Sequence, residues 1–266
     1  MFTGADAYDR FMGRYSRPLA PLLADFAGVA AGARVLDVGC GPGALTSELV
    51  RRVGPDLVSA VDPSEPFVEA ALHRHPGVDV RRSAAEQLPF EDGEFDAALA
   101  QLVVHFMADP VAGLREMTRV TRSGGVVAAC VWDLTEGGGP LARFWTAARE
   151  LDPDADDESQ RAGARRGHLA ELLAQVGVDD VDEATLTVRV RHASFDDWWG
   201  PFNLGVGPAG SYLESLDEER RERLRGRCAR NFPAAGLTVS ARAWAARCRP
   251  GPAPPSAFLE SREESM

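Results

Sequence analysis

A glycine-rich turn between an apolar strand and a helical segment constrains the fold of this chain most. Val35, Leu36 and Val38 form a short apolar run, which predicts a buried parallel strand. The turn at 39–43 carries three glycines, which allow backbone conformations and close approaches that side chains would obstruct. After it, residues 44–53 have apolar side chains spaced four apart, as on one face of a helix. Together they predict the first unit of a nucleotide-type binding fold.

Apolar runs alternate with helical patterns through the rest of the first half. The expected strands are 34–38, 57–61, 78–82, 95–100 and 125–132, and the expected helices are 43–53, 64–74 and 109–121. Two later segments, 184–190 and 237–247, read as strands that pair antiparallel. Such alternation predicts βαβ units. The predicted fold class is therefore α/β, a Rossmann-like, mainly parallel sheet of seven strands with helices on both faces.

The length of 266 residues fits one large α/β domain, which we expect at 1–249. Residues 6–27 ahead of the first strand predict one or two amphipathic helices laid against the domain. Residues 195–232 form an extra segment before the last strand. The proline-rich, polar stretch 250–266 predicts a disordered tail.

The inserted segment and the loop before it allow local predictions. Ser215 and Glu218 have the spacing of a capping box, at the start of an arginine-rich helix over 215–230. The acidic run 152–158 predicts a solvated loop. Three aromatic side chains could line an acceptor cavity or form the core of the insertion, and we favour the core: Trp198, Trp199 and Phe202.

Charge and cysteine usage exclude several classes of function. The formal net charge of −11 disfavours a nucleic-acid partner. The four cysteines form no CxxC pair and show no metal-ligand spacing, which predicts reduced thiols, no metal and a cytosolic compartment. We see no signal peptide and no apolar stretch near the ~20 residues that span a bilayer, so a cytoplasmic protein without a membrane partner is expected.

The glycine turn also fits the loose form G-x-G-x-x-A of dinucleotide sites, so the nucleotide must be identified. Pro42 removes one backbone donor that a diphosphate would use. Asp37 would repel the diphosphate by about 3 kcal/mol at ~6 Å and an effective dielectric of ~20. A cationic ligand without phosphate would instead be attracted. S-adenosylmethionine (SAM), with its ammonium and sulfonium groups, is such a ligand.

The run 35–43 resembles the first motif of class I SAM-dependent methyltransferases, in the subgroup related to ubiquinone and menaquinone methylases. Further motifs follow in the family's order. Residues 58–62 resemble the second strand with its terminal acid, 85–90 the adenine-binding turn, and 101–106 the loop that closes over the methionine end of SAM. The resemblance covers residues 6–132, with family-like elements continuing to about 247, and implies SAM as cofactor.

The resemblance implies that Asp62 binds both ribose hydroxyls, for which a carboxylate is suited, and that Pro63 flanks the adenine. The remaining residues that it assigns to the cofactor are Asp37, Gly39, Cys40, Gly41, Ala85, Glu86 and Gln101. One position departs from the family pattern, because Ala84 stands where an acid that reaches the adenine amino group is often found. The adenine contact is then left to the backbone of Ala85 and to Glu86.

Candidate residues for the acceptor come from the segments around the expected cavity. His105 lies in the loop at the carboxyl edge of the sheet, so it is a candidate general base, or alternatively a packed histidine at a helix start. Trp132 follows strand five and would contact substrate or the core. Tyr8, Arg14 and Tyr15 lie in the segment that folds over SAM as a lid in this subgroup, where Arg14 would meet the SAM carboxylate or solvent.

We therefore expect methyl transfer from SAM to a small-molecule acceptor by in-line displacement, under a roof formed by 6–27 and 195–232. Much of the catalysis would come from alignment, on the order of 7 kcal/mol. The alternatives are a SAM-binding protein without catalysis and a dinucleotide-dependent oxidoreductase. The sequence reveals neither the acceptor atom nor the oligomeric state.

Overall fold

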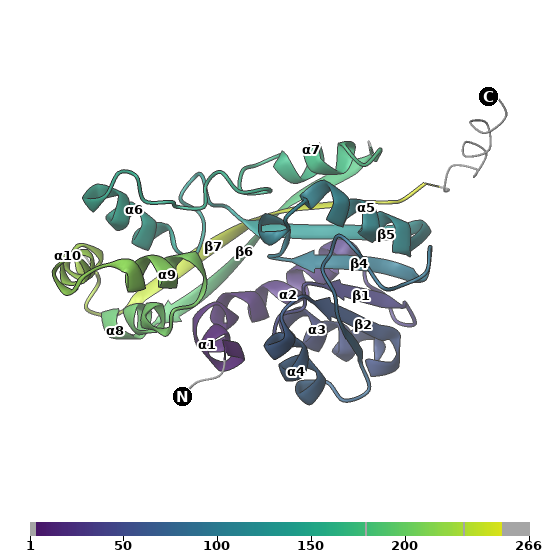
Figure 1. Cartoon of the computed structure of the whole chain (residues 1–266), viewed down its shortest axis with the longest axis horizontal. Coiled ribbons are helices and arrows are strands. Elements are labelled where there is room, and N and C mark those ends of the chain that lie inside the picture. Colours follow the sequence, from purple (N-terminus) through teal and green to yellow (C-terminus); the bar gives the residue numbers. More distant parts are fainter. Residues whose placement is uncertain (1–3, 179, 231, 252–266) are drawn as a thin grey trace, which may run out of the picture.

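The structure is a computed structural model that describes residues 4–178, 180–230 and 232–251, and it is built on one seven-stranded sheet (Figure 1). The strands are β1 (Val35–Val38), β2 (Val58–Asp62), β3 (Asp79–Arg82), β4 (Phe95–Gln101), β5 (Thr121–Trp132), β6 (Val181–His192) and β7 (Leu237–Cys248). Their order is β3-β2-β1-β4-β5-β7-β6, and β7 runs antiparallel to β5 and β6. The predicted fold class, including the antiparallel late pair, is confirmed.

Helices cover both faces of this sheet, as predicted. One face carries α2 (Gly13–Ala27), α3 (Ala44–Val53) and α4 (Glu65–Arg74), and the other carries α5 (Pro110–Val120) and α7 (His168–Ala174). The short α1 (Gly4–Phe11) precedes α2 and contacts α4, while η1 (Pro55–Leu57) and η2 (Val104–Phe106) are single 3₁₀ turns. Every residue of β1 and β2 is buried, because both faces of these central strands are covered.

Two observed strands, β5 and β6, extend well beyond the predicted ranges 125–132 and 184–190. β5 begins at Thr121, which pairs with Phe95 before a shift in register. In the sequence, residues 122–125 have the composition of a turn, so this early pairing was not visible. β6 spans 181–192, and buried and exposed residues alternate over its second half, as expected where one face of a strand is covered.

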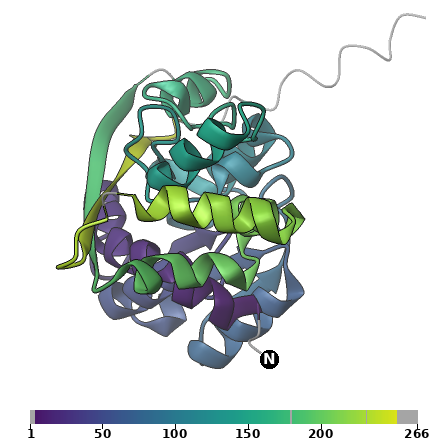
Figure 2. The same ribbon diagram turned by 90° about the vertical axis from the view of Figure 1, so that its left-hand side faces the viewer.

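The long β6–β7 hairpin supports a second group of helices, here called the cap lobe. It consists of α6 (Ala142–Leu151), α8 (Phe195–Trp199), η3 (Gly200–Leu204), α9 (Gly207–Ser215) and α10 (Glu218–Ala229). Figure 1 shows the lobe at the far end of the hairpin, and Figure 2 looks onto α9 and α10. Trp198, Trp199 and Phe202 are 5% exposed or less and pack in an aromatic core with Phe144, which confirms the predicted core role.

Three local predictions need correction. The helix expected over 215–230 begins at Glu218, because the carboxylate of Asp217 caps it by accepting the N–H of Arg220 at 2.8 Å. Ser215 instead ends α9, where its hydroxyl donates to the Tyr212 carbonyl at 2.7 Å. The loop 152–158 is not solvated throughout, since Glu158 is only 4% exposed.

The predicted tail begins with ordered backbone, because the Pro250 carbonyl accepts the N–H of Gly124 at 2.9 Å. The rest of that prediction, 252–266, lies outside the described residues. Among the helices that the structure describes, none is long and apolar enough to cross a membrane.

Candidate functional site

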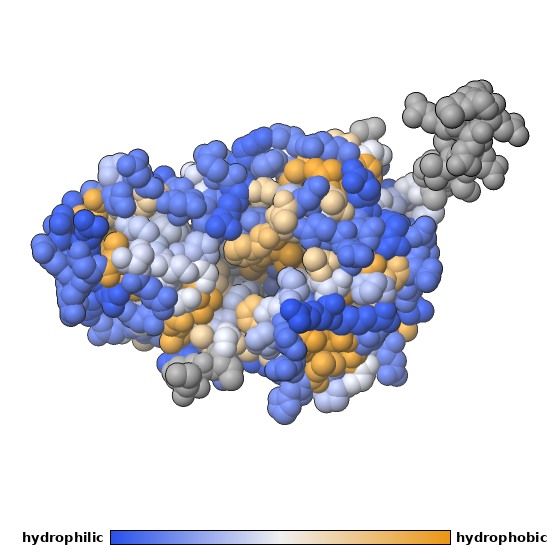
Figure 3. Space-filling view, viewed as in Figure 1, coloured by the Kyte–Doolittle hydropathy of each residue, from blue (hydrophilic) through white to orange (hydrophobic). Residues whose placement is uncertain are grey.

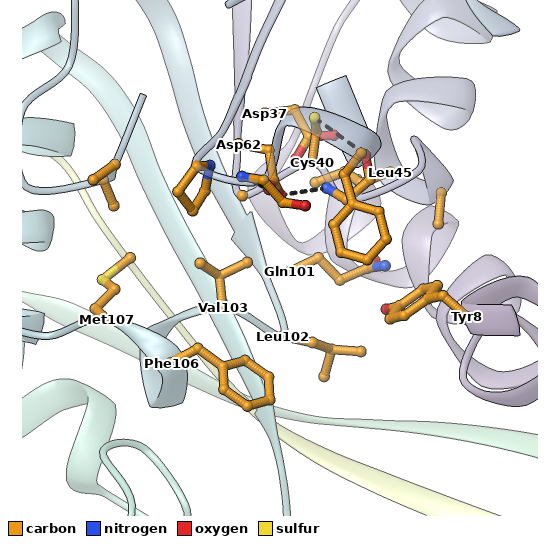
Figure 4. A pocket seen from close by; sticks show the side chains of 18 of the residues that line it. Tyr8, Asp37, Cys40, Leu45, Asp62, Gln101, Leu102, Val103, Phe106 and Met107 are labelled. Carbon is orange, nitrogen blue, oxygen red and sulfur yellow. Dashed lines mark hydrogen bonds between the residues drawn. The ribbon is translucent and has the colours of Figure 1, made fainter. Parts of the chain in front are cut away.

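The main cavity opens at the carboxyl ends of β1, β2 and β4, where the strand order reverses between β1 and β4. Such a switch point is where open α/β sheets bind ligands. The cavity measures about 470 Å³, within the range of small-molecule sites. A hollow with hydrophobic surface beside it is visible near the middle of the face in Figure 3, and Figure 4 shows the lining from close by. Its polar or charged lining side chains include Tyr8, Asp37, Asp62, Ser64, Glu86 and Gln101.

The glycine turn forms one wall because its backbone adopts conformations that side chains disfavour. Gly39, Gly41 and Gly43 have φ of +71°, +53° and +94°. A Cβ on Gly39 would also lie 2.5 Å from the methyl groups of Val103, so only glycine lets the β4 loop approach this closely. The N–H groups of Gly39 and Cys40 both donate to the carbonyl of Val61, at 2.8 and 2.9 Å, which fixes the turn to β2.

Asp37 presents a buried carboxylate oxygen with no partner. Its side chain is at the end of β1 and the residue is 1% exposed. The Thr46 hydroxyl donates to Oδ2 at 2.6 Å, whereas Oδ1 has no hydrogen-bond partner among the described residues. Burial raises the pKa of Asp37 to about 7, although the Thr46 bond opposes this. A cationic ligand in the cavity would satisfy Oδ1 and favour the ionised form.

Asp62 lies at the end of β2 and is held in place by backbone donors. The N–H of Gly41 donates to Oδ2 and the N–H of Ser64 donates to Oδ1, both at 2.8 Å. Burial raises the pKa of Asp62 despite these bonds. Each oxygen keeps a further lone pair, so the carboxylate remains able to accept hydrogen bonds from two neighbouring hydroxyls.

Gln101 ends β4 and offers a second buried acceptor. Its Nε2 donates to the carbonyl of Ser16 at 3.0 Å, which ties β4 to α2, while Oε1 has no partner in the described part of the chain. The next residue, Leu102, lines the cavity with φ of +63°, a conformation that non-glycine residues rarely adopt. Sequence reasoning missed Leu102, because backbone strain has no signature in residue type.

Pro63, Ala85 and Glu86 line the cavity beyond Asp62, on the side where the resemblance places the adenine. The Glu86 carboxylate accepts the N–H groups of Ala108 and Asp109, at 2.8 and 3.2 Å. Glu86 thus holds the loop after η2 across this end of the cavity. Glu86 therefore has a structural role in addition to the adenine contact expected from the sequence.

Tyr8 brings α1 to the cavity. Its ring packs edge-on against Phe67 of α4, with 5.8 Å between centroids, and burial raises the pKa of its hydroxyl to about 12. Arg74 strengthens this attachment, because it pairs with Asp9 of α1 at 2.7 Å and donates to the Pro42 carbonyl at 2.9 Å. The glycine turn and α1 are therefore linked through α4.

His105 does not line this cavity. The residue is 9% exposed, and its pKa is lowered to about 3, first by burial and then by Arg161. Its neighbour Phe106 lines the cavity instead and is 57% exposed. In a 3₁₀ turn such as η2, consecutive side chains point in different directions, so the sequence identified the right loop but not the residue that reaches the cavity.

Arg14, Tyr15 and Trp132 also lie outside the cavity lining. The guanidinium of Arg14 is held by Asp197, at 2.9 and 3.2 Å, and by the Arg191 carbonyl at 3.1 Å. The Tyr15 hydroxyl is 2.8 Å from Nε2 of His192, and Trp132 packs edge-on against the Tyr15 ring. These contacts join α2 to β6 and α8. The partners of Arg14 and Tyr15 are more than 170 residues away in the chain, so the sequence did not reveal them.

None of the described residues of 195–232 lines the main cavity, so the expected roof differs from the observed one. The aromatic side chains of that segment are used in the cap lobe's own core. The roof near the cavity comes instead from α1, through Tyr8, and from the loop and turn after β4, through Leu102, Phe106 and Met107. Figure 4 shows the carboxylates of Asp37 and Asp62 on one side of the view and Phe106 on the opposite side.

These features together fit an adenosine-bearing cation. Two buried oxygens, Asp37 Oδ1 and Gln101 Oε1, have no partner among the described residues and belong to side chains that line one cavity. The Asp62 carboxylate is held by two backbone N–H groups and keeps lone pairs that can accept further hydrogen bonds. The four cysteines are free and buried. Within the described residues, no cluster of His, Cys, Asp and Glu could hold a metal ion.

Comparisons with known proteins agree with this geometry. Residues 36–129 match a family described as "Methyltransferase domain". A demethylmenaquinone methyltransferase from Renibacterium salmoninarum is 32% identical over 62% of this chain and 74% of its own length. The first curated relatives are matched over only 36–56% of their length.

Solved structures share the fold at lower identity. YcgJ from Bacillus subtilis has a TM-score of 0.58 and 19% identity, covering 88% of this chain and 98% of that one. A Haemonchus contortus phosphoethanolamine N-methyltransferase, solved with S-adenosylhomocysteine, has a TM-score of 0.54 and 15% identity, covering 95% of this chain and 61% of that one.

Proposed function

Because this chain belongs to the class I SAM-dependent methyltransferases, we propose that it transfers a methyl group from SAM to a small-molecule acceptor by in-line displacement. The observation that carries the proposal is a pair of buried oxygens, on Asp37 and Gln101, that have no partner within the described part of the chain and line one cavity beside an acid suited to a ribose. A cation with a vicinal diol meets all three requirements.

We assign the following binding roles to the residues that line the cavity. Asp37 balances the charge of the methionine end, Asp62 binds the ribose hydroxyls, and Pro63, Ala85 and Glu86 border the adenine. The glycines of the turn let the backbone approach the ligand closely. When bound, SAM supplies an electrophilic methyl group on a sulfonium. The chain's contribution is then to align the acceptor with that group and to exclude water.

A general base from this chain is not part of the proposal. A histidine with a pKa of about 3 is a weak proton acceptor, and His105 does not line the cavity. The acids that do line it, Asp37, Asp62 and Glu86, are all assigned to the cofactor. The acceptor atom is therefore one that reacts without losing a proton to a side chain, or one that is already ionised.

The size of the cavity and the charge of the chain support a small acceptor. A volume of about 470 Å³ suits a small molecule beside or within the cofactor site, and the net charge of −11 would repel a phosphate backbone. These are supports for the proposal and identify no particular acceptor.

Calorimetric titration with SAM, S-adenosylhomocysteine and NADH tests the cofactor. We expect both adenosyl ligands to bind and NADH to give no heat. Binding of NADH alone would support the dinucleotide alternative. Incubation with methyl-labelled SAM and a library of small acceptors tests the activity, and binding without any labelled product would favour a SAM-binding protein without catalysis.

A further inference from the structure

A cation lies beside an exposed aromatic ring of the cavity lining. Phe106, which lines the cavity, is 57% exposed, although the other large apolar side chains around the cavity are much less so. The guanidinium carbon of Arg161 lies 5.3 Å from the centroid of the Phe106 ring. Arg161 comes from the segment between α6 and α7 and does not itself line the cavity, so its relation to the cavity is through its contact with Phe106.

The donors of Arg161 are not used by the described part of the protein. No hydrogen bond to its guanidinium occurs there, and its nearest acid is Glu158, at 3.8 Å from Nε. That distance is beyond hydrogen-bonding range. The Arg161 side chain is 31% exposed, so water screens its charge only in part. The hydrogen-bond donors of its guanidinium have no acceptor in the described core.

Glu158 pairs with Arg161 and helps to hold it in place. Its side chain is 5% exposed; burial raises its pKa, and the charge of Arg161 opposes that rise. Its backbone has φ of +66°, and its carbonyl accepts the Arg161 N–H at 3.1 Å. Because the side chains are 3.8 Å apart, the ion pair leaves the N–H donors of the guanidinium available for a hydrogen-bonded ligand.

We propose that Phe106 and Arg161 form the acceptor subsite, and that it selects an aromatic molecule bearing a carboxylate. The exposed part of the Phe106 ring supplies an apolar contact for the acceptor ring. The guanidinium presents paired donors that match a carboxylate. This inference rests on the proposed function, because it assigns to the cavity mouth the substrate of the same reaction.

Arg161 is the cation that an anionic group beside Phe106 would meet, because the described lining of the main cavity contains three acids, Asp37, Asp62 and Glu86, and no arginine. Arg161 also contributes to the lowered pKa of His105, which keeps that histidine neutral beneath Phe106. An anionic acceptor is consistent with a cavity that lacks a general base.

The test uses the full chain saturated with S-adenosylhomocysteine, and two probes of similar shape. These are 1-naphthoate and its neutral counterpart 1-naphthalenemethanol, titrated by calorimetry at low salt. We expect naphthoate to bind at least about tenfold more tightly. Arg161→Gln should weaken naphthoate by about tenfold to a hundredfold, the loss typical of a charged hydrogen bond, and leave naphthalenemethanol unchanged. Arg161→Lys should retain part of the affinity.

Arg166→Gln is the matched control, because Arg166 is an exposed arginine five residues away, and it should bind naphthoate as the unaltered chain does. Phe106→Ala should weaken both probes. Equal binding of the two probes, no binding of either, or equal effects of the two glutamine variants would overturn the subsite. Failure to bind S-adenosylhomocysteine would instead contradict the proposed function, so the two failures are distinguishable.

Discussion

The half of the molecule that surrounds the glycine turn and the cap lobe are built on different principles. Around the turn, the shape of the cavity wall depends on backbone geometry, as the three positive φ values and the close approach of Val103 to Gly39 show. In the cap lobe, order comes from aromatic side chains that pack on each other, such as Phe144 stacked on Phe202 at 4.6 Å. The first kind of order is local in the chain and the second is not.

This difference teaches where a sequence is informative. A glycine-rich turn or a strand-terminal acid is recognisable within a few residues of sequence, so the turn, Asp37 and Asp62 were identifiable. An aromatic core is visible in the sequence only as a segment rich in aromatic residues, and the wall of a cavity could have the same composition. The predictions below test whether substitutions in the cap lobe change stability without changing cofactor binding, and whether substitutions at the cavity do the opposite.

The largest effect should come from the cap lobe. Phe144→Ala removes a fully buried ring, and we expect it to lower the free energy of unfolding by about 3–5 kcal/mol. The dissociation constant of SAM should stay unchanged, because Phe144 does not line the cavity. Denaturant unfolding and calorimetry measure the two. Leu72→Ala, at an exposed position, is the control with little effect on either. A parallel loss of SAM affinity would show that the regions are coupled.

The opposite behaviour is expected from Asp62→Ala. Loss of the carboxylate should weaken SAM binding by about 1–3 kcal/mol, because charge-assisted hydrogen bonds to the ribose disappear. Asp56→Ala, at an exposed position in η1, provides a matched acid outside the cavity and should bind SAM normally. Calorimetric titration decides the matter. Equal affinities for the two variants would refute the ribose assignment.

The raised pKa of Asp37 predicts a pH dependence of binding. Because SAM favours the ionised carboxylate, its affinity should fall by roughly tenfold per pH unit as pH drops from about 7 to 5, with proton release on binding. Titrations in buffers of different ionisation enthalpy measure this release. Asp37→Asn should bind weakly but without this pH dependence, and a sloping profile in that variant would assign the proton elsewhere.

Asp37 also affects the stability of the unliganded protein, with the opposite sign. Its folded pKa, about 7, lies above the ordinary value of 3.8, so burial stabilises the neutral acid in the folded state. That contribution is present below about pH 4 and is lost as pH rises through about 7. Unfolding curves of the chain and of Asp37→Asn should therefore differ in their slope between these values.

The smallest effect concerns the start of α10. Asp217→Ala should cost about 1 kcal/mol of stability through loss of the N-cap, while Ser215→Ala should have less effect, because Ser215 lies before the helix. Thermal unfolding of the two variants compares them directly. A larger loss for Ser215→Ala would restore the capping box expected from the sequence.

The fold itself followed closely from the sequence, because period and composition determine which strands are buried. The site followed in part. Asp37, Asp62 and Gln101 are at the ends of strands, and the sheet topology brings strand ends together. Arg14 and Tyr15 were expected at the cavity but are engaged by Asp197 and His192, from a hairpin distant in the chain.

Phe106 and Arg161 illustrate the remaining limit. Phe106 stands next to the histidine that chemistry singled out, and only the path of a 3₁₀ turn determines which of the two reaches the cavity. Arg161 lies in a segment whose composition indicates only a loop. Its relation to Phe106 is a tertiary contact, which no local pattern encodes.

The pairing of His192 with Leu237 has a consequence for how such a chain changes over time. The segment between these two residues carries α8, α9 and α10, and it leaves the sheet and returns to it at one pair of the ladder, so its two ends are held side by side. A replacement segment would have to close the same short gap. It would also have to pack against Phe144 of α6 and provide a partner for Arg14 of α2, because the present segment makes both contacts. Exchange of this segment during evolution therefore requires matched changes in α2 and α6.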